Sequence, residues 1–289
     1  MTAEKKRNSP FAEMWRRLKK NKPAMASLLV ILLLAMLVVG ADWIVSYDKA
    51  VTQHVELKLA SPGPGHPFGG DGLGRDLFAR VIHGTRISLL LGFGATAITT
   101  IVGTILGAST AYFGGWYDSI IMRILDIIIS IPIILLALAI ASGFGIGIVQ
   151  LVISIAIGQI ASFTRVIRAS VLNVASQEYI EAAKAIGIGD FTIILRHVIP
   201  NVLGTIQVQF TMQVAENILM GATLGFLGLG AKIPAPEWGK ILSEGLPYLR
   251  FTSHIVVFPT LFIAVTALSI NLFGDGLRDA FDPKLKGKA

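Results

Sequence analysis

Residues 24–45 read AMASLLVILLLAMLVVGADWIV, a predominantly apolar stretch of 22 residues. A helix of about 20 apolar residues spans the roughly 30 Å of hydrocarbon in a bilayer. The apolar core of a cleaved secretory signal is shorter, about 7–15 residues, and precedes a small-residue cleavage site that is missing here. Eight basic residues come before the stretch: Lys5, Lys6, Arg7, Arg16, Arg17, Lys19, Lys20 and Lys22. We therefore expect residues 24–45 to remain as a membrane anchor.

The composition of the whole chain agrees with a membrane location. Of its 289 residues, 53% are hydrophobic and only 15% are charged. A soluble domain carries about 25% charged residues, because water must solvate its surface. Much of this surface is therefore expected to face lipid. The chain has no cysteine, which excludes disulfides, thiol catalysis and cysteine-ligated metals.

Five further apolar stretches have the composition of transmembrane helices, although one of them is short. They are 87–112, 124–142, 147–163, 201–225 and 255–273. Together with residues 24–45 they predict an all-α membrane protein with six transmembrane helices. Pro132 and Pro259 fall inside two of the stretches, and we expect them to kink those helices.

The distribution of basic residues predicts the orientation. With both termini in the cytoplasm, 17 of the 25 Lys and Arg residues fall in cytoplasmic segments, as the positive-inside tendency requires. Within the core of the chain, the loop at 164–200 then faces the cytoplasm and the loop at 226–254 faces outward. The expected organisation is a cytoplasmic basic amphipathic N-terminus at 1–23, the first anchor at 24–45, an extracytoplasmic loop at 46–86, a core transmembrane domain at 87–273 and a cytoplasmic tail at 274–289.

The N-terminal segment contains an amphipathic pattern. Phe11, Met14, Trp15 and Leu18 recur at the spacing of one helix face within residues 10–20, and basic residues occupy the other face. Such a helix is suited to lie on the anionic inner leaflet of the membrane.

The cytoplasmic loop contains a short helix with its own start and stop signals. Its sequence is SQEYIEAAKAIGIGD, at residues 176–190. Ser176 is suited to cap the helix, and Glu178 lies in the first turn, where negative charge favours the helix dipole. Gly187 supplies the stop. The alanines between them leave part of the helix surface smooth, so that the backbone of another protein can approach it.

A second short helix is expected directly after the first, over residues 190–198. The sequence there continues FTIILRHVIPN, and Pro200 is expected to end the helix. Two short helices that project from a membrane bundle form a docking element. A soluble partner that moved this element would rock the attached transmembrane helices.

The loop resembles a known motif. The residues that carry the resemblance are Glu181, Ala182, Ala183, Gly187 and Pro200. Their types and spacing are similar to the EAA loop of the permease subunits of binding-protein-dependent ABC importers. His197 and Ile199 stand where the general family has isoleucine and leucine. That departure resembles the dipeptide/oligopeptide/nickel branch of the family.

Further segments resemble the C-type permeases of the same branch, over about residues 10–284. They are HPFGGDGLGRD at 66–76, FLGLG at 226–230, PEWG at 236–239 and GDGLRD at 274–279. The resemblance implies a protein of the bacterial or archaeal cytoplasmic membrane. It implies a pathway shared with a B-type permease subunit, two ATP-binding subunits and an extracytoplasmic solute-binding protein.

The resemblance also assigns roles within the loop. Residues 181–187 would form the coupling helix, seated in a cleft of an ATPase subunit, with Glu181 making polar contact and Gly187 forming the bend. Ala182 and Ala183 would be closely apposed to the ATPase. ATP and Mg would bind the partner subunits, because the phosphate-binding pattern G-x-x-x-x-G-K-[ST] does not occur in this chain. We therefore expect no catalytic residue, metal site or cofactor in this chain.

One predicted transmembrane helix carries a polar face. Its residues are Gln209, Gln213, Glu216 and Asn217. Glu216 lies near the middle of the span, where a charge costs about 3 kcal/mol unless it faces a polar interior. The face is expected to line the translocation path or, alternatively, to form a hydrogen-bonded seam with the partner permease. Arg123 and Asp126, three residues apart near the third span, are expected to pair.

Other functions find less support in the sequence. The net charge of +7 does not form the basic stripe with interleaved aromatics that nucleic-acid binding requires. The five histidines have no metal-binding spacing. A secondary transporter would need ion-coupling residues at broken helices, and an intramembrane protease would need a Ser–His pair or paired aspartates. The expected solutes are di- and oligopeptides, with nickel or glutathione-like solutes as the alternative.

Overall fold

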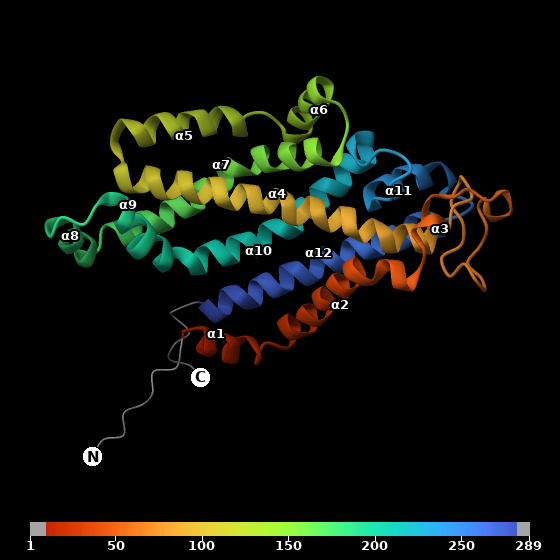
Figure 1. Cartoon of the computed structure of the whole chain (residues 1–289), viewed down its shortest axis with the longest axis horizontal. Coiled ribbons are helices and arrows are strands. Elements are labelled where there is room, and N and C mark those ends of the chain that lie inside the picture. Colours follow the sequence, from red (N-terminus) through yellow and green to blue (C-terminus); the bar gives the residue numbers. More distant parts are fainter. Residues whose placement is uncertain (1–9, 282–289) are drawn as a thin grey trace, which may run out of the picture.

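The computed structural model describes residues 10–281, with side chains from Met14 onward. Over these residues the chain is built from helices and contains no β-strand. The arrangement is shown in Figure 1. The α-helices are α1 (Pro10–Leu18), α2 (Lys22–Ile44), α3 (Tyr47–Val51), α4 (Leu77–Phe113), α5 (Gly115–Ile129), α6 (Ile133–Phe144), α7 (Ile148–Ala175), α8 (Glu178–Ala185), α9 (Asp190–Ile193), α10 (Ile199–Leu224), α11 (Trp238–Gly245) and α12 (His254–Phe281).

Five helices are long and apolar enough to cross a membrane. They are α2, α4, α7, the helical segment Asp190–Leu229 that contains α10, and α12. Helices α5 and α6 are bent by 86° relative to each other. If they are counted together as one broken span, they make a sixth crossing. The kink expected at Pro132 within residues 124–142 is therefore a complete break between two helices. Pro132 lies at the break in an extended conformation (φ −54°, ψ 131°), and it lacks the N–H that a continuous helix would need.

Two predicted boundaries differ from the structure. α4 begins directly after Asp76, whose carboxylate accepts a hydrogen bond from the backbone N–H of Ala79 at 2.8 Å. Residues 77–86, which the sequence placed in a loop, therefore belong to α4. Hydropathy missed the first turns of α4 because Arg80 and His83 are polar, although the structure buries both. At the other end of the chain, α12 continues past the expected boundary at residue 273.

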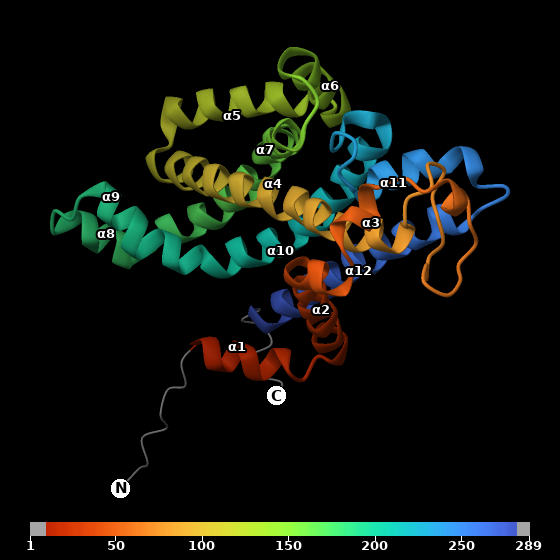
Figure 2. The same cartoon turned by 45° about the vertical axis from the view of Figure 1, so that its right-hand side comes forward.

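The long helices pack side by side in both views (Figures 1 and 2). α4 contacts α7 and α10, while α12 contacts α10 and α2. We call the part of the molecule with α8 and α9 the α8 end, and the opposite part with α3 and α11 the α11 end. The C-terminal part of α12 and helix α1 lie toward the α8 end (Figure 1).

The predicted amphipathic helix at the N-terminus is present as α1, and it packs on α12. A Cβ atom added to Gly276 of α12 would lie 2.4 Å from Ala24 Cβ and 3.4 Å from Leu18 Cδ1. This close approach therefore requires glycine. Met14 and Leu18 are buried against the chain itself, whereas Trp15 is partly exposed.

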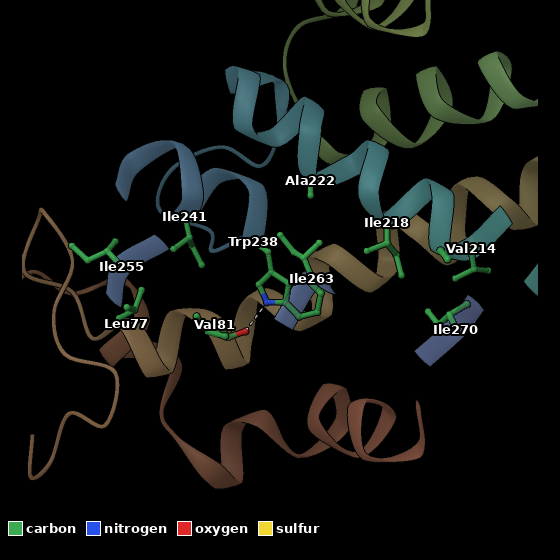
Figure 3. Packing of buried hydrophobic residues seen from close by; sticks show 11 residues of the cluster. Leu77, Val81, Val214, Ile218, Ala222, Trp238, Ile241, Ile255, Ile263 and Ile270 are labelled. Carbon is green, nitrogen blue, oxygen red and sulfur yellow. Dashed lines mark hydrogen bonds between the residues drawn. The ribbon is translucent and has the colours of Figure 1, made fainter. Parts of the chain in front are cut away.

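The core at the α11 end is centred on Trp238 (Figure 3). This side chain is completely buried, and its Nε1 donates a hydrogen bond to the carbonyl oxygen of Val81 at 3.0 Å. Its backbone N–H donates to Ser88 Oγ at 3.2 Å. Ile218 of α10 and Ile263 of α12 belong to the same cluster. Trp238 therefore joins α11 to α4, α10 and α12.

Candidate functional site

The predicted short helix in the loop is present as α8. Gln177 is its N-cap, although without a side-chain hydrogen bond, and Ser176 instead ends α7. The expected role of Ser176 as N-cap is therefore wrong. Glu178 and Glu181 lie in the first turn of α8, where their charges favour the positive end of the helix dipole.

Gly187 ends α8 as the sequence predicts. Its φ is +82°, a left-handed conformation that glycine adopts without steric cost. The Gly187 N–H donates to the carbonyl oxygen of Lys184 at 3.0 Å, and the Ile188 N–H donates to that of Ala183 at 3.1 Å. These two bonds form a Schellman motif, which satisfies carbonyls that the helix end would leave free. The direction of the chain after α8 is thus fixed by its own backbone.

α8 has a buried face and an exposed face. Ile180 and Ala183 are buried in a cluster with Ile167, Ile193 and other side chains of this chain. Ala183, which is expected to contact an ATPase subunit, packs its methyl group against the chain itself. Ala182 is exposed on the other face.

The exposed face of the α8 end contains large apolar side chains. Tyr179 is 44% exposed, Ile186 is 77% exposed and Phe191 is 74% exposed. Glu181 and Ala182 lie among them on the surface of α8. This part of the chain therefore offers a mixed apolar and acidic surface.

Pro200 begins a helix rather than ending one. It lies in the first turn of α10, where a missing N–H removes no helical hydrogen bond. A π-helical turn over Ile194–Val198 connects α9 to α10, so the chain stays helical from one to the other. Asn201 Nδ2 donates to the carbonyl oxygen of His197 at 2.6 Å within this segment. The expectation of a separate second helix ended by Pro200 is therefore wrong.

Tyr112 connects the α8 end to the bundle. This residue lies at the end of α4, and its hydroxyl donates to Asp190 Oδ1 of α9 at 2.6 Å. Lys184 of α8 places its ammonium group 4.5 Å from the centre of the Tyr112 ring, a cation–π contact. One side chain of α4 therefore holds both short helices.

Two ion pairs join α5 to α7. Arg168 Nε donates to Asp118 Oδ1 at 2.7 Å, and its Nη2 donates to Asp118 Oδ2 at 2.5 Å. Arg165 donates to Asp126. The predicted pairing of Arg123 with Asp126 is therefore replaced by an ion pair between two helices.

The predicted polar face of α10 divides into two environments. Gln213 and Asn217 are buried, Gln209 is half-buried, and Glu216 is exposed. Gln213 Nε2 donates to Gln159 Oε1 of α7 at 3.3 Å. Asn217 Nδ2 donates to Thr96 Oγ1 of α4 at 2.9 Å. Gln213 and Asn217 therefore form a polar seam inside this chain, and only Glu216 presents a charge outward.

A buried ion network at the α11 end was not predicted as a site. Asp71 Oδ2 accepts hydrogen bonds from Arg75 Nε at 2.7 Å and from Arg80 Nη1 at 2.5 Å. Glu244 Oε2 of α11 accepts from Arg75 Nη2 at 2.6 Å and from Arg80 Nη1 at 2.8 Å. Both arginine side chains are 1% exposed. Burial alone would raise the pKa of Asp71, but the charges of Arg80 and Arg75 and two backbone N–H groups lower it overall.

Glu237 is a second buried carboxylate at this end. It caps α11, accepting from the Gly239 N–H at 2.7 Å and from the Lys240 N–H at 3.0 Å. A Cβ atom on Gly225 would lie 2.0 Å from Glu237 Oε2, so the glycine-rich segment leaves room for this carboxylate. Burial raises the pKa of Glu237 to about 7, more than the hydrogen bonds from Gly239 and Lys240 lower it.

Within residues 10–281, no group of three or more His, Asp or Glu side chains is arranged to hold a metal ion. His66 Nδ1 lies 2.6 Å from Oδ2 of Asp76, the N-cap of α4, and these two residues form a pair.

Two family profiles match the chain. One, described as binding-protein-dependent transport system inner membrane component, matches residues 100–287. The other, described as the N-terminal TM domain of oligopeptide transport permease C, matches residues 9–62.

Relatives and a solved structure agree with these profiles. Glutathione transport system permease protein GsiD of Escherichia coli O6:K15:H31 (strain 536 / UPEC) and that of Shigella boydii serotype 4 (strain Sb227) are each 43% identical over 279 residues, which are 96% of this chain and 92% of the relative. An inward-facing structure of the MetNI methionine ABC transporter is 18% identical, with a TM-score of 0.58, over 70% of this chain and 97% of that chain. This structural likeness shows the fold alone. The chain belongs to the binding-protein-dependent transport system inner membrane components, and it is a permease subunit of an ABC importer of the peptide/nickel branch.

Proposed function

We propose that this chain forms one half of the translocation pathway of an ATP-driven importer of short peptides, with α8 as its coupling helix. The observation that carries the proposal is the exposed face of α8. Tyr179 on α8 and Ile186 directly after it are large apolar side chains that stay exposed, although Ile180 and Ala183 of the same helix pack into the bundle. Exposed apolar side chains gathered on one face mark a surface that another protein covers.

The proposed partner at this face is an ATPase subunit, which binds ATP and Mg and performs all the catalysis. Glu181 makes polar contact with it, and Ala182 allows close approach. Gly187 holds the angle of α8, and Pro200 begins the helix that receives the motion. Ala183 takes part indirectly, because it fixes α8 on its own bundle. A second, B-type permease subunit completes the pathway, and a solute-binding protein delivers the solute.

The proposed orientation places both termini and the α8 end in the cytoplasm, and the α11 end outside. The excess of basic residues in the segments on the α8 side supports it. In this orientation residues 1–23 and 274–289 are cytoplasmic, and residues 46–76 belong to the extracytoplasmic side.

Glu216 is proposed to face the pathway or the partner permease, together with Gln209. A carboxylate exposed on a transmembrane helix needs polar surroundings, because lipid cannot solvate it. Gln213 and Asn217 support this face from behind, through their hydrogen bonds to α7 and α4.

The proposed solute is a short peptide, glutathione included. Two observations support this choice. The relatives that are 43% identical over almost the whole chain are glutathione transport permeases. The N-terminal segment matches a domain of oligopeptide transport permeases. Glutathione is itself a tripeptide, so both point to the same class of solute.

The test of the coupling helix is Ile186→Asp, with Val55→Asp as the matched control. Both residues are exposed, at 77% and 89%. Ile186 directly follows α8, whereas Val55 lies a few residues after α3, and α3 and α8 are at opposite ends of the molecule (Figure 1). We expect the Ile186 variant to insert normally into membranes and to lose its ATPase subunits during affinity purification. The Val55 variant should keep them. Normal recovery of ATPase and normal transport by Ile186→Asp would contradict the proposal.

A further inference from the structure

The break between α5 and α6 leaves a hollow that the sequence did not indicate. Its volume is about 240 Å³, and α7 and α10 form its other walls. Ile133, the first residue of α6, closes onto α7 at Gly158, where an added Cβ atom would lie 2.6 Å from Ile133 Cδ1. The start of α6 is therefore held in place on α7, and the hollow is part of the packed structure.

The backbone at the break has carbonyl groups that need a partner. The Ser130 and Ile131 N–H groups bond back into α5, and the Leu136 N–H bonds to the Pro132 carbonyl. In the part of the chain that the structure describes, no main-chain N–H reaches the carbonyls of Ile129, Ser130 or Ile131. Irregular backbone at membrane depth is tolerated only inside protein or beside a water-filled cavity. The carbonyls at the break therefore need polar surroundings, and Ile129 and Ile131 are among the residues that line the hollow.

The polar groups of the hollow are uncharged. Gln159 and Ser162, one turn apart on α7, line it, and no charged side chain of the described residues does so. Gln159 is oriented by its hydrogen bond from the buried Gln213. An amide and a hydroxyl each donate and accept hydrogen bonds. The remaining walls are apolar, and Met220 of α10 is a side chain that adapts to different shapes.

We propose that this hollow is where the transported solute contacts this chain, and that it receives the uncharged amide groups of a short peptide. The proposal rests on the proposed function as an importer. Gln159 and Ser162 match the donors and acceptors of a peptide group, and the apolar walls accept its side chains. The hollow is not suited to a metal cation, because its lining residues offer neither a carboxylate nor an imidazole.

The first test measures access from water. The chain contains no cysteine, so a single introduced thiol reports on one position. In the assembled importer, Ser162→Cys and Met220→Cys should react rapidly with a charged methanethiosulfonate reagent. Trialanine or glutathione, supplied with binding protein and ATP, should slow the reaction. Ile153→Cys is the control, because Ile153 is exposed on the opposite side of α7 and does not line the hollow.

The proposal is overturned if both thiols react as slowly as the one at position 153 in an importer that transports peptide. It is also overturned if they react rapidly but neither peptide changes the rate. The two thiols lie on different helices, so the test can still be read if one of the two variants fails to assemble.

The second test separates contact from structure. Gln159→Met keeps the shape of the side chain but removes the amide, and we expect transport of trialanine to fall about three- to tenfold while ATPase subunits stay bound. Gln213→Met removes the same hydrogen bond from its buried side. An equal loss in both variants, or no loss at position 159, overturns the assignment. Failure of the wild-type chain to bind any ATPase subunit would instead overturn the proposed function.

Discussion

The two ends of the molecule differ in which polar and apolar side chains they bury. At the α11 end, Arg75 and Arg80 are buried in an ion network, and Trp238 of α11 packs against α4, α10 and α12 (Figure 3). At the α11 end the chain thus buries charged and aromatic groups in its own core, although Val55 at that end is 89% exposed. At the α8 end, Tyr179, Ile186 and Phe191 form an exposed apolar surface of the kind that a partner protein covers.

The largest expected effect comes from removing the core of the α11 end. Trp238→Ala should lower the free energy of unfolding by about 3–5 kcal/mol, because a large buried side chain leaves a cavity. Thermal unfolding of the purified chain in detergent measures it. Trp43→Ala is the control, since Trp43 is 87% exposed. Equal unfolding temperatures for the two variants would contradict a core centred on Trp238.

The next effect concerns the ion network. Asp71→Asn removes a charge shared by Arg75 and Arg80 and should cost about 3 kcal/mol, because both guanidiniums stay buried. Asp118→Asn removes a partner from Arg168, whose side chain is 30% exposed, and should cost about 1 kcal/mol or less. Comparison of the two unfolding free energies tests the contrast between the ends. The predicted contrast is contradicted if the Asp118→Asn variant is less stable than the Asp71→Asn variant.

Glu237 predicts a pH dependence at the α11 end. Its pKa is raised by burial to about 7, from an ordinary value of 4.5. The folded chain thus holds a proton that the unfolded chain has released, so the free energy of unfolding should fall as pH rises from 4.5 to 7 and then level off. The change amounts to no more than about 3 kcal/mol. Unfolding measured across this range should show a shallower slope for Glu237→Gln, and an unchanged slope would refute the assignment.

The last prediction distinguishes the buried face of α8 from its exposed face. Ala183→Trp should destabilise the chain by about 1–3 kcal/mol, because it overpacks the cluster beneath α8. Ala182→Trp adds the same volume on the exposed face and should leave unfolding unchanged, while it weakens binding of the ATPase subunits. Unfolding and co-purification of the same two preparations give both readouts. Equal destabilisation by the two substitutions would contradict the assignment of faces.

Local sequence patterns predicted the structural features that depend on residues close together in the chain. Gly187 ends α8 because a left-handed residue suits that position, and this signal lies within a few residues. The apolar stretches predicted the long helices for the same reason. Pro132 indicated a kink, but the 86° bend depends on how Ile133 packs on Gly158 of another helix. Local sequence holds no information about that contact.

The sites that escaped prediction depend on distant residues. Arg80 and Glu244 are 164 positions apart, and no spacing rule could pair them. Glu216 and Gln213 share a helical face in projection, yet Gln213 is buried because Gln159 of α7 lies opposite it. Ala183 looked equivalent to Ala182 in the motif. Only the packing of Ile193 and its neighbours decides which of the two alanines is exposed.

The π-helical turn at Ile194–Val198 gives the molecule a mechanical property. Because this turn joins α9 to α10 without a loop, the segment from Asp190 to Leu224 is a single rod about 50 Å long. A loop would absorb a displacement by bending, whereas a rod transmits it. A small tilt imposed at Asp190 therefore displaces the other end of α10, which lies beside Trp238.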